Sequence, residues 1–254
     1  MINQNEQSIQ SALQRISNIL LINGGFVDNP GLYFGEMGLV LFFFRYARYT
    51  GNELYKEYGF RLIEKIQNRI HEETTIDYKH GLAGIGSAIE YLVQNEFIKA
   101  DTDDVLENFD KRIFHTYNLE FLPVETIESI GYFAYWRTSG KSTKKDSILH
   151  TILIPIERIM HDHSITPAWH RPLCNSNSLY LKKETYHHWL GYFSRKSNLS
   201  VSPFEGIDKL GEHTSLPPRL GIHNGLTGLG LALLTELDGD ISWTALFPND
   251  QTHF

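Results

Sequence analysis

The sequence contains little of what several large classes of protein require. Its 254 residues include a single cysteine, Cys174, so no disulfide can form within the chain, as is usual in a reducing compartment. No apolar stretch approaches the roughly 18 to 20 residues that a membrane-spanning helix needs. The first residues also lack the basic and apolar regions of a secretory signal peptide. We therefore expect a soluble, cytoplasmic protein with no membrane partner.

Positive charge is also scarce. The chain carries 23 Lys and Arg against 30 Asp and Glu, which gives a formal net charge of −7. The basic residues form no sustained run, and the small group of Lys141, Lys144 and Lys145 falls in an expected loop. A protein that binds nucleic acid presents a basic surface to the phosphates. The sequence therefore predicts no nucleic-acid partner.

What the sequence does contain is a recurring glycine motif. Its copies are Gly35-Glu36-Met37-Gly38, Gly81-Leu82-Ala83-Gly84, the weaker Glu128-Ser129-Ile130-Gly131, and Gly225-Leu226-Thr227-Gly228. The last glycines are separated by 46, 47 and 97 residues, and the third step is close to twice the others. A degenerate copy that has lost its glycines is therefore expected near residues 177–179. A period of this length indicates a repeat architecture, in which each unit buries its apolar face against its neighbours.

Each glycine motif is followed by an apolar stretch of helical length. Leu, Ala, Phe and Tyr recur there at three- and four-residue spacing, whereas the alternation typical of strands is weak. More polar, amphipathic helices follow the first three stretches, with Asn52 and Asp101 at expected N-cap positions. The apolar helices are predicted at 39–49, 85–97, 132–136 and 229–237, and the amphipathic ones at 53–71, 101–117 and 144–161. A leading helix at 4–21 carries Ile9, Leu13, Ile16, Leu20 and Leu21 on one side.

These helix pairs predict an all-α fold in a single domain over residues 1–254. Inner apolar and outer amphipathic helices that close on themselves form an α/α toroid. Glycine at the start of the inner helices favours this arrangement, because their N-termini would crowd together at one end of the ring. Residues 198–221 are rich in proline and glycine and are expected to form a long loop.

Three of the repeated segments resemble the motifs of lanthionine synthetase C-like (LanC-like) proteins. They are Gly31-Leu32-Tyr33-Phe34-Gly35-Glu36-Met37-Gly38, Asp77-Tyr78-Lys79-His80-Gly81-Leu82-Ala83-Gly84, and Gly221-Ile222-His223-Asn224-Gly225-Leu226-Thr227-Gly228. The resemblance implies a toroid of seven inner and seven outer helices, of which this chain would be a shortened or incomplete form. It also implies zinc at one end of the cavity, where the metal activates a peptide cysteine for addition to a dehydrated serine or threonine.

The chain departs from this family at the zinc ligands. Cyclases of the family use one cysteine after a tryptophan and a Cys-His pair before a glycine. Here Trp169 is followed by His170, Asn224 separates His223 from its glycine, and Cys174 stands alone. We therefore predict a member of the family with no metal ligands of that type and no cofactor.

The resemblance does supply candidates for acid–base chemistry and for substrate binding. Asp77 stands four residues before the motif glycine Gly81 and His80 directly before it, so both are predicted as catalytic acid–base residues. From the residues alone, His80 could equally hydrogen-bond the neighbouring turn, and Asp77 could complement a helix dipole. The residues expected to hold substrate at the same end of the ring are Tyr33, Glu36, His223 and Asn224.

The expected function is to bind or escort a ribosomally made peptide during lanthipeptide-type modification, with a peptide-modifying enzyme as a further partner. Zinc-dependent thioether cyclisation is not expected. One alternative is an active cyclase with an unusual ligand set drawn from Cys174 and the histidines of residues 161–188. The other is an α/α-toroid carbohydrate enzyme, which needs two carboxylates across the cavity; the acids available for it are Glu36, Asp77, Glu128 and Glu205.

Overall fold

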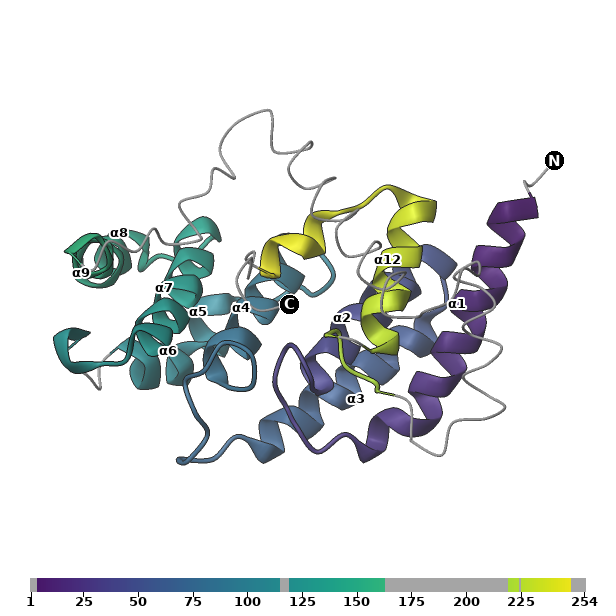
Figure 1. Cartoon of the computed structure of the whole chain (residues 1–254), viewed down its shortest axis with the longest axis horizontal. Coiled ribbons are helices and arrows are strands. Elements are labelled where there is room, and N and C mark those ends of the chain that lie inside the picture. Colours follow the sequence, from purple (N-terminus) through teal and green to yellow (C-terminus); the bar gives the residue numbers. More distant parts are fainter. Residues whose placement is uncertain (1–3, 115–118, 163–218, 224, 248–254) are drawn as a thin grey trace.

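The computed structural model describes residues 4–114, 119–162, 219–223 and 225–247 (Figure 1). Every regular element in these ranges is a helix, as predicted. Several predictions concern residues outside the described ranges. They are the degenerate repeat near 177–179, the loop residues 198–218, Asn224, Cys174 and the histidines after His161. None of the helices in the described part of the chain has the length and apolar character needed to cross a bilayer.

The described helices follow one another in pairs, as the repeat predicts. They are α1 (Gln4–Asn23), η1 (Gly24–Phe26), α2 (Glu36–Thr50), α3 (Glu53–Arg69), α4 (Leu82–Gln94), α5 (Thr102–Val105), α6 (Glu107–Phe114), η2 (Leu119–Phe121), α7 (Val124–Ser139), α8 (Lys145–Ile148), the π-helical η3 (Leu149–Leu153), α9 (Ile154–Asp162), α12 (Leu226–Asp238) and η5 (Ser242–Leu246).

These elements form an inner and an outer layer (Figure 1). The inner helices lie in the order α12, α2, α4, α7, each packed against the next, and outer helices cover them. The outer helix α1 packs on α12, α3 on α2, α5 and α6 on α4, and α8 with η3 and α9 on α7. Although α12 is far from α1 and α2 in sequence, it lies between them. The contact of α12, the last described α-helix, with α1, the first, is the arrangement that a toroid requires.

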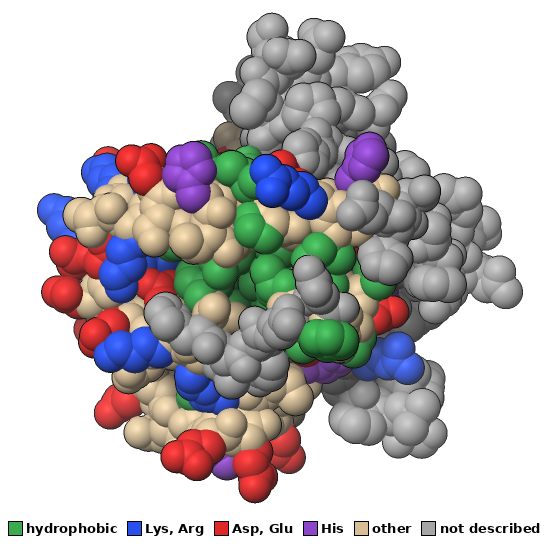
Figure 2. Space-filling view, turned by 90° about the vertical axis from the view of Figure 1, so that its left-hand side faces the viewer, with side chains coloured by type: hydrophobic (Ala, Val, Ile, Leu, Met, Phe, Trp, Pro, Cys, Tyr) green, Lys and Arg blue, Asp and Glu red, His purple; other side chains and the backbone are tan. Residues whose placement is uncertain are grey.

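The described inner helices form an arc that begins at α12 and ends at α7. Among the described residues, α7 has an inner helix on one side only, α4. Figure 2 faces this end of the molecule, where apolar side chains are exposed near the centre and acidic and basic side chains lie mainly to their left and below them.

Helix boundaries differ from the predictions in a systematic way. The three inner helices that carry complete motifs begin with the motif itself: Gly35, Gly81 and Gly225 are extended N-cap residues, and the last motif glycine is the third helical residue. In α7 the position of the N-cap glycine is taken by Glu128, so the helix runs through the motif and begins at Val124. The predicted start at residue 132 was therefore wrong, because no residue there interrupts the helix.

The outer helices are capped where the sequence indicated. The side chain of Asn52 accepts a hydrogen bond from the Leu54 amide (3.0 Å), and that of Asp101 accepts one from Asp103 (2.9 Å). The predicted helix 101–117 is divided at Leu106 into α5 and α6. The helix predicted at 144–161 contains the π-helical turn 149–153, which ends two residues before Pro155. Proline lacks an amide hydrogen and cannot continue an α-helical ladder.

One hydrophobic core joins both layers. On α1, Ile9, Leu13, Ile16 and Leu20 are buried in it and Leu21 packs against it, which confirms the predicted apolar side of this helix. The glycines of the inner helices allow close helix contacts. A Cβ on Gly86 would lie 2.5 Å from the ring of Phe133 in α7, and one on Gly230 would lie 2.5 Å from the ring of Phe42 in α2.

The loops before α2, α4 and α12 share one backbone hydrogen-bond pattern. In each case the first two amides of the helix donate to carbonyls seven residues earlier in the chain. The pairs are Glu36 with Asn29 (2.8 Å), Met37 with Pro30 (3.3 Å), Leu82 with Thr75 (2.9 Å), Ala83 with Ile76 (3.2 Å), Leu226 with Arg219 (2.9 Å) and Thr227 with Leu220 (3.2 Å). The loops thus satisfy amides that an isolated helix would leave without partners. This shared bonding is the physical basis of the repeat.

The three loops also bond to one another, and we call the surface they form the glycine rim (residues 29–35, 75–81 and 219–223). The Tyr33 amide donates to the Lys79 carbonyl (3.0 Å), and the Tyr33 carbonyl accepts from Ile222 (2.9 Å) and His223 (3.0 Å). A Cβ on Gly31 would overlap the backbone of His80, and one on Gly221 would lie 2.8 Å from the Tyr33 carbonyl. Glycine is needed at both positions because neighbouring backbones touch there.

Gly31→Ala tests this requirement. We expect a loss of about 1–3 kcal/mol in the free energy of unfolding, since the neighbour that must move is backbone. Gly25→Ala is the control, because a Cβ at this position would meet no atom within 4 Å, and it should change stability by less than about 0.5 kcal/mol. Urea unfolding followed by circular dichroism measures both. Equal stability of the two variants would contradict the close approach of the rim loops.

A buried ionic cluster at Arg137 joins α4, α5, α6 and α7. The Arg137 side chain is fully enclosed, and its guanidinium bonds to Glu90 (2.5 Å), Asp103 (2.7 Å) and both oxygens of Asp110 (2.8 and 2.9 Å). Lys144 reaches Asp110 from the start of α8 (3.2 Å). Partial burial opposes ionisation of Asp103, but bonds from Ser142, Thr143 and Arg137 outweigh it and hold the pKa of this carboxyl well below its usual range.

The cluster predicts a loss of stability in acid. Because the pKa of Asp103 is lowered by folding, its contribution is complete above the unfolded value of about 4 and is lost as pH falls through the folded value. We expect the free energy of unfolding to fall steadily below pH 4, and to fall less steeply in Asp103→Asn. Urea titrations from pH 7 to pH 2 measure this. The same slope in both proteins would remove Asp103 as the cause.

Candidate functional site

The glycine rim brings together four of the predicted site residues: Tyr33, Asp77, His80 and His223. They come from three loops that are separated in sequence and joined through the backbone of Tyr33. The side chains of Asp77 and His80 are about half exposed, at 42% and 49%. The rim is therefore an accessible surface on which acid–base and aromatic groups meet.

Asp77 and His80 form a pair within one turn. The Asp77 carboxylate accepts hydrogen bonds from the His80 amide (2.6 Å) and from Nδ1 of the His80 ring (2.9 Å). The turn is closed by the Gly81 amide, which donates to the Asp77 carbonyl (2.9 Å). Because a carboxylate only accepts hydrogen bonds, Nδ1 carries the proton and Nε2 of a neutral ring is left as an acceptor. The pair can thus present one basic nitrogen in a fixed orientation.

Phe34 connects this pair to His223. The rings of Phe34 and His80 are stacked, with centroids 5.0 Å apart and planes 12° from parallel. Phe34 also meets the half-buried His223 in an edge-to-face arrangement, with ring centroids 5.2 Å apart. Phe34 is 40% exposed, so its ring is accessible between the two histidines. Sequence reasoning missed it, although Phe34 occupies the same position before Gly35 as His80 does before Gly81.

Tyr33 lies beneath this surface. Its side chain is almost fully buried, with its ring 5.0 Å from Phe247 and 6.4 Å from Tyr78. The Lys79 ammonium lies 5.7 Å from the centre of the same ring. Its backbone position at the junction of the three loops makes Tyr33 a support of the rim. The predicted contact of Tyr33 with substrate stays a prediction.

Glu36 is placed away from the paired Asp77 and His80. It is the first residue of α2, is fully buried, and faces the outer helix α3, where its carboxylate is 2.5 Å from Lys65 Nζ and 3.5 Å from Arg69 Nη1. Lys65 and Arg69 also bond to the carbonyls of Gly25 and Val27, so the cluster fixes the loop before α2. A substrate role for Glu36 stays a prediction, while its observed contacts join the start of α2 to the outer helix α3.

The donor groups do not fit a zinc site of the kind that the resemblance implies. Such a site needs two cysteine thiolates and an imidazole, and the sequence has one cysteine, Cys174. Among the residues that the structure describes, no group of three or more His, Cys, Asp and Glu is arranged to hold a metal ion. In the rim, Nδ1 of His80 is engaged by Asp77. We therefore derive no chemical step through zinc.

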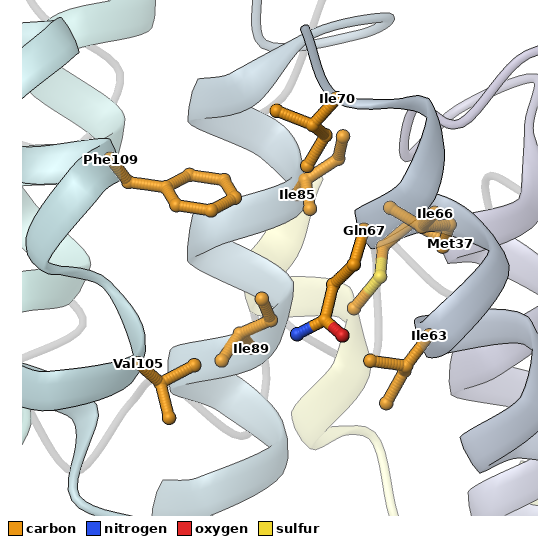
Figure 3. Close-up of a pocket in the computed structure, with 9 residues that line it drawn as sticks. All are labelled: Met37, Ile63, Ile66, Gln67, Ile70, Ile85, Ile89, Val105 and Phe109. Carbon is orange, nitrogen blue, oxygen red and sulfur yellow. The ribbon is translucent and has the colours of Figure 1, made fainter.

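A separate apolar pocket lies between the layers (Figure 3). It encloses about 300 Å³ including its open mouth and is lined by side chains of α2, α3, α4, α5 and α6. These are Met37, Ile63, Ile66, Gln67, Ile70, Ile85, Ile89, Val105 and Phe109, with the Gln67 amide as the polar group among them. The pocket contains none of the predicted site residues.

The comparison with known protein families agrees with the repeat. The family described as lanthionine synthetase C-like protein matches residues 26–202, more than two thirds of the chain. The match includes Tyr33, Glu36, Asp77 and His80 and ends before His223. No curated protein and no solved structure matches the chain. From this match, together with the paired helices and their glycine-led loops, we conclude that the chain belongs to the lanthionine synthetase C-like family.

Proposed function

We propose that this chain binds a peptide at the glycine rim and serves lanthipeptide-type modification as a binding or escort protein. The observation that carries the proposal is the grouping of Asp77, His80, Phe34 and His223 by three interlocked loops. The partners in this proposal are the peptide and the enzyme that modifies it. The reducing cytoplasm, which suits a chain with one cysteine, is the proposed compartment.

The chemistry of the rim suits a peptide that carries apolar and hydroxyl or thiol side chains. The stacked rings of Phe34 and His80 offer a flat face against which an apolar side chain can pack with little loss of entropy. Nε2 of His80 can accept a hydrogen bond from a hydroxyl, a thiol or a backbone amide. Asp77 holds the ring in place, so the ligand does not have to order it.

Binding is favoured over cyclisation because the described residues include no metal-ligand set that could activate a thiol. A free cysteine has a pKa of about 8.5, and zinc or a strongly cationic neighbour is needed to make it a thiolate at neutral pH. The rim carries the imidazoles of His80 and His223 but no thiolate, so the donor set for zinc is incomplete there. A neutral imidazole such as that of His80 can accept a proton, but it does not supply the charge that would stabilise a thiolate.

The proposal is tested with a fluorescein-labelled synthetic peptide that contains one dehydroalanine and one cysteine. We expect fluorescence anisotropy to show saturable binding to the wild-type protein, and Phe34→Ala or His80→Ala to weaken it about 5- to 30-fold, the effect of 1–2 kcal/mol. Phe26→Ala and His71→Ala are matched controls, since both replace exposed rings outside the rim. Thermal melts establish that all four variants are folded.

Three results would contradict the proposal. Equal affinity in the rim and control variants, or no binding at all, would show that the rim is not the site. The peptide thiol should also stay fully reactive with iodoacetamide after incubation with the protein. If the thiol lost its reactivity, and a chelator prevented this loss and added zinc restored it, the protein would be a cyclase.

A further inference from the structure

The inner sides of the helices carry a row of polar groups that are enclosed by protein. On α4, Ile85 and Ile89 face the outer helices, whereas Tyr91 lies roughly 200° further around and points to the opposite side. The members of the row are Arg45 of α2, Tyr91 of α4, Thr235 of α12 and Tyr78 of the rim, each at most 5% exposed. Burial raises the pKa of Tyr91 to about 12, so its hydroxyl keeps its proton well above neutral pH.

All four polar groups bond to one segment, residues 238–247, which we call the strap. Arg45 holds its first part: Nη2 lies 3.0 and 3.1 Å from the two carboxylate oxygens of Asp238 and donates to the backbone carbonyl of Asp240 (2.8 Å). The Asp240 carboxylate lies 3.6 Å from the same guanidinium. Partial burial opposes ionisation of Asp240, but Arg45 and bonds from Ser242 outweigh it and keep its pKa below its usual range.

The remaining contacts follow the strap towards the rim. The hydroxyls of Tyr91 and Ser242 are 2.9 Å apart, and the Trp243 indole donates to Thr235 Oγ1 (3.0 Å). The Tyr78 hydroxyl donates to the Leu246 carbonyl (3.1 Å). The last described residue, Phe247, packs against the ring of Tyr33.

The strap therefore runs along the inner helices from their C-terminal ends to the glycine rim. Arg45 is nine residues beyond the start of α2, which corresponds to about 14 Å of helix. The six steps from Asp240 to Leu246, mostly in the 3₁₀-helical η5, cover about 12 Å at 2 Å each. The two lengths agree, so one short segment passes from Arg45 to the underside of the rim.

The contacts to the strap are those by which a protein recognises a peptide. They engage two backbone carbonyls, two carboxylates, a serine hydroxyl, an indole NH and an aromatic ring. We propose that the inner surface formed by Arg45, Tyr78, Tyr91 and Thr235 is a peptide-binding site that residues 238–247 occupy in cis, so that the strap excludes a ligand peptide with acidic residues followed by serine and tryptophan. This extends the proposed peptide binding from the rim to the ring interior and rests on it for the class of ligand.

The junction of the strap with α12 suits a segment that can leave. Helix α12 ends at Asp238, and Gly239 follows in the left-handed conformation (φ 70°) with open space around it. Asp238 and Asp240, which carry the Arg45 contact, are partly exposed, at 28% and 37%. Three buried apolar side chains, Trp243, Leu246 and Phe247, keep the strap in place. A peptide that offers the same groups can replace them.

Native-state hydrogen exchange on the wild-type chain gives the first test. The amides of Thr244 and Phe247 donate within the strap. We expect them to exchange at least tenfold faster than the buried amides of α4 and α12, through an opening that leaves both helices protected. If they exchange only with global unfolding, at the same protection as α4, the strap is a permanent part of the core and the proposal is overturned.

Binding of the strap sequence in trans gives the second test. The probe is a fluorescein-labelled peptide of residues 238–247, and the loosened protein is the double variant Asp238→Asn, Asp240→Asn in the full chain. We expect this variant to bind the probe at least tenfold more tightly than the wild type. The control Glu53→Gln, Glu57→Gln removes the same charge from exposed positions of α3 and should behave as wild type.

The outcomes separate this inference from binding at the rim. Binding by the loosened variant that survives Phe34→Ala places the probe in the interior and supports the proposal. Equal affinity of the loosened variant, the control and the wild type would overturn it, as would a failure of the folded loosened variant to bind. Neither negative result would alter the rim measurements with the dehydroalanine peptide.

Discussion

The peptide unit of Tyr33 is the point on which the arrangement of the glycine-led loops depends. Its amide bonds to the loop before α4 and its carbonyl accepts two amides from the loop before α12, so three repeats that are distant in sequence share one connection. Glycine at positions 31 and 221 lets the backbones come close enough for these bonds. Asp77, His80, Phe34 and His223 are brought together as a result. The chemistry of the rim is thus set by the main chain.

Much of the fold could be predicted because its signals are local. Apolar periodicity located the inner helices, and Asn52 and Asp101 cap the outer ones as their types indicate. The Asp77–His80 contact is also local, since three residues separate its partners. Phe34 was missed because its exposure and its stacking on His80 depend on how two loops pack. The enclosure of Glu36 by Lys65 and Arg69, and that of Arg137 by three acids, likewise required tertiary structure.

The rim and the strap are in direct contact. The strap passes beneath the rim loops, and its last described residue contacts Tyr33, whose backbone supports Phe34 and His80. A ligand that displaced the strap would remove the packing under this support, so binding in the interior and binding at the rim are expected to be energetically coupled. The ionic cluster at Arg137 includes no residue of the rim or the strap, so its contacts between α4 and α7 do not depend on the strap.

The position of α12 has a consequence for how the chain acquires its structure during synthesis. Ile16 of α1 packs close to Gly230 of α12, and roughly two hundred residues of translation separate the two helices. The apolar side of α1 consequently leaves the ribosome long before α12, the helix that packs on it, has been synthesised. Contacts between residues so far apart in sequence slow folding and prolong the exposure of apolar surface. The nascent chain is therefore expected to engage holding chaperones until its final helices emerge.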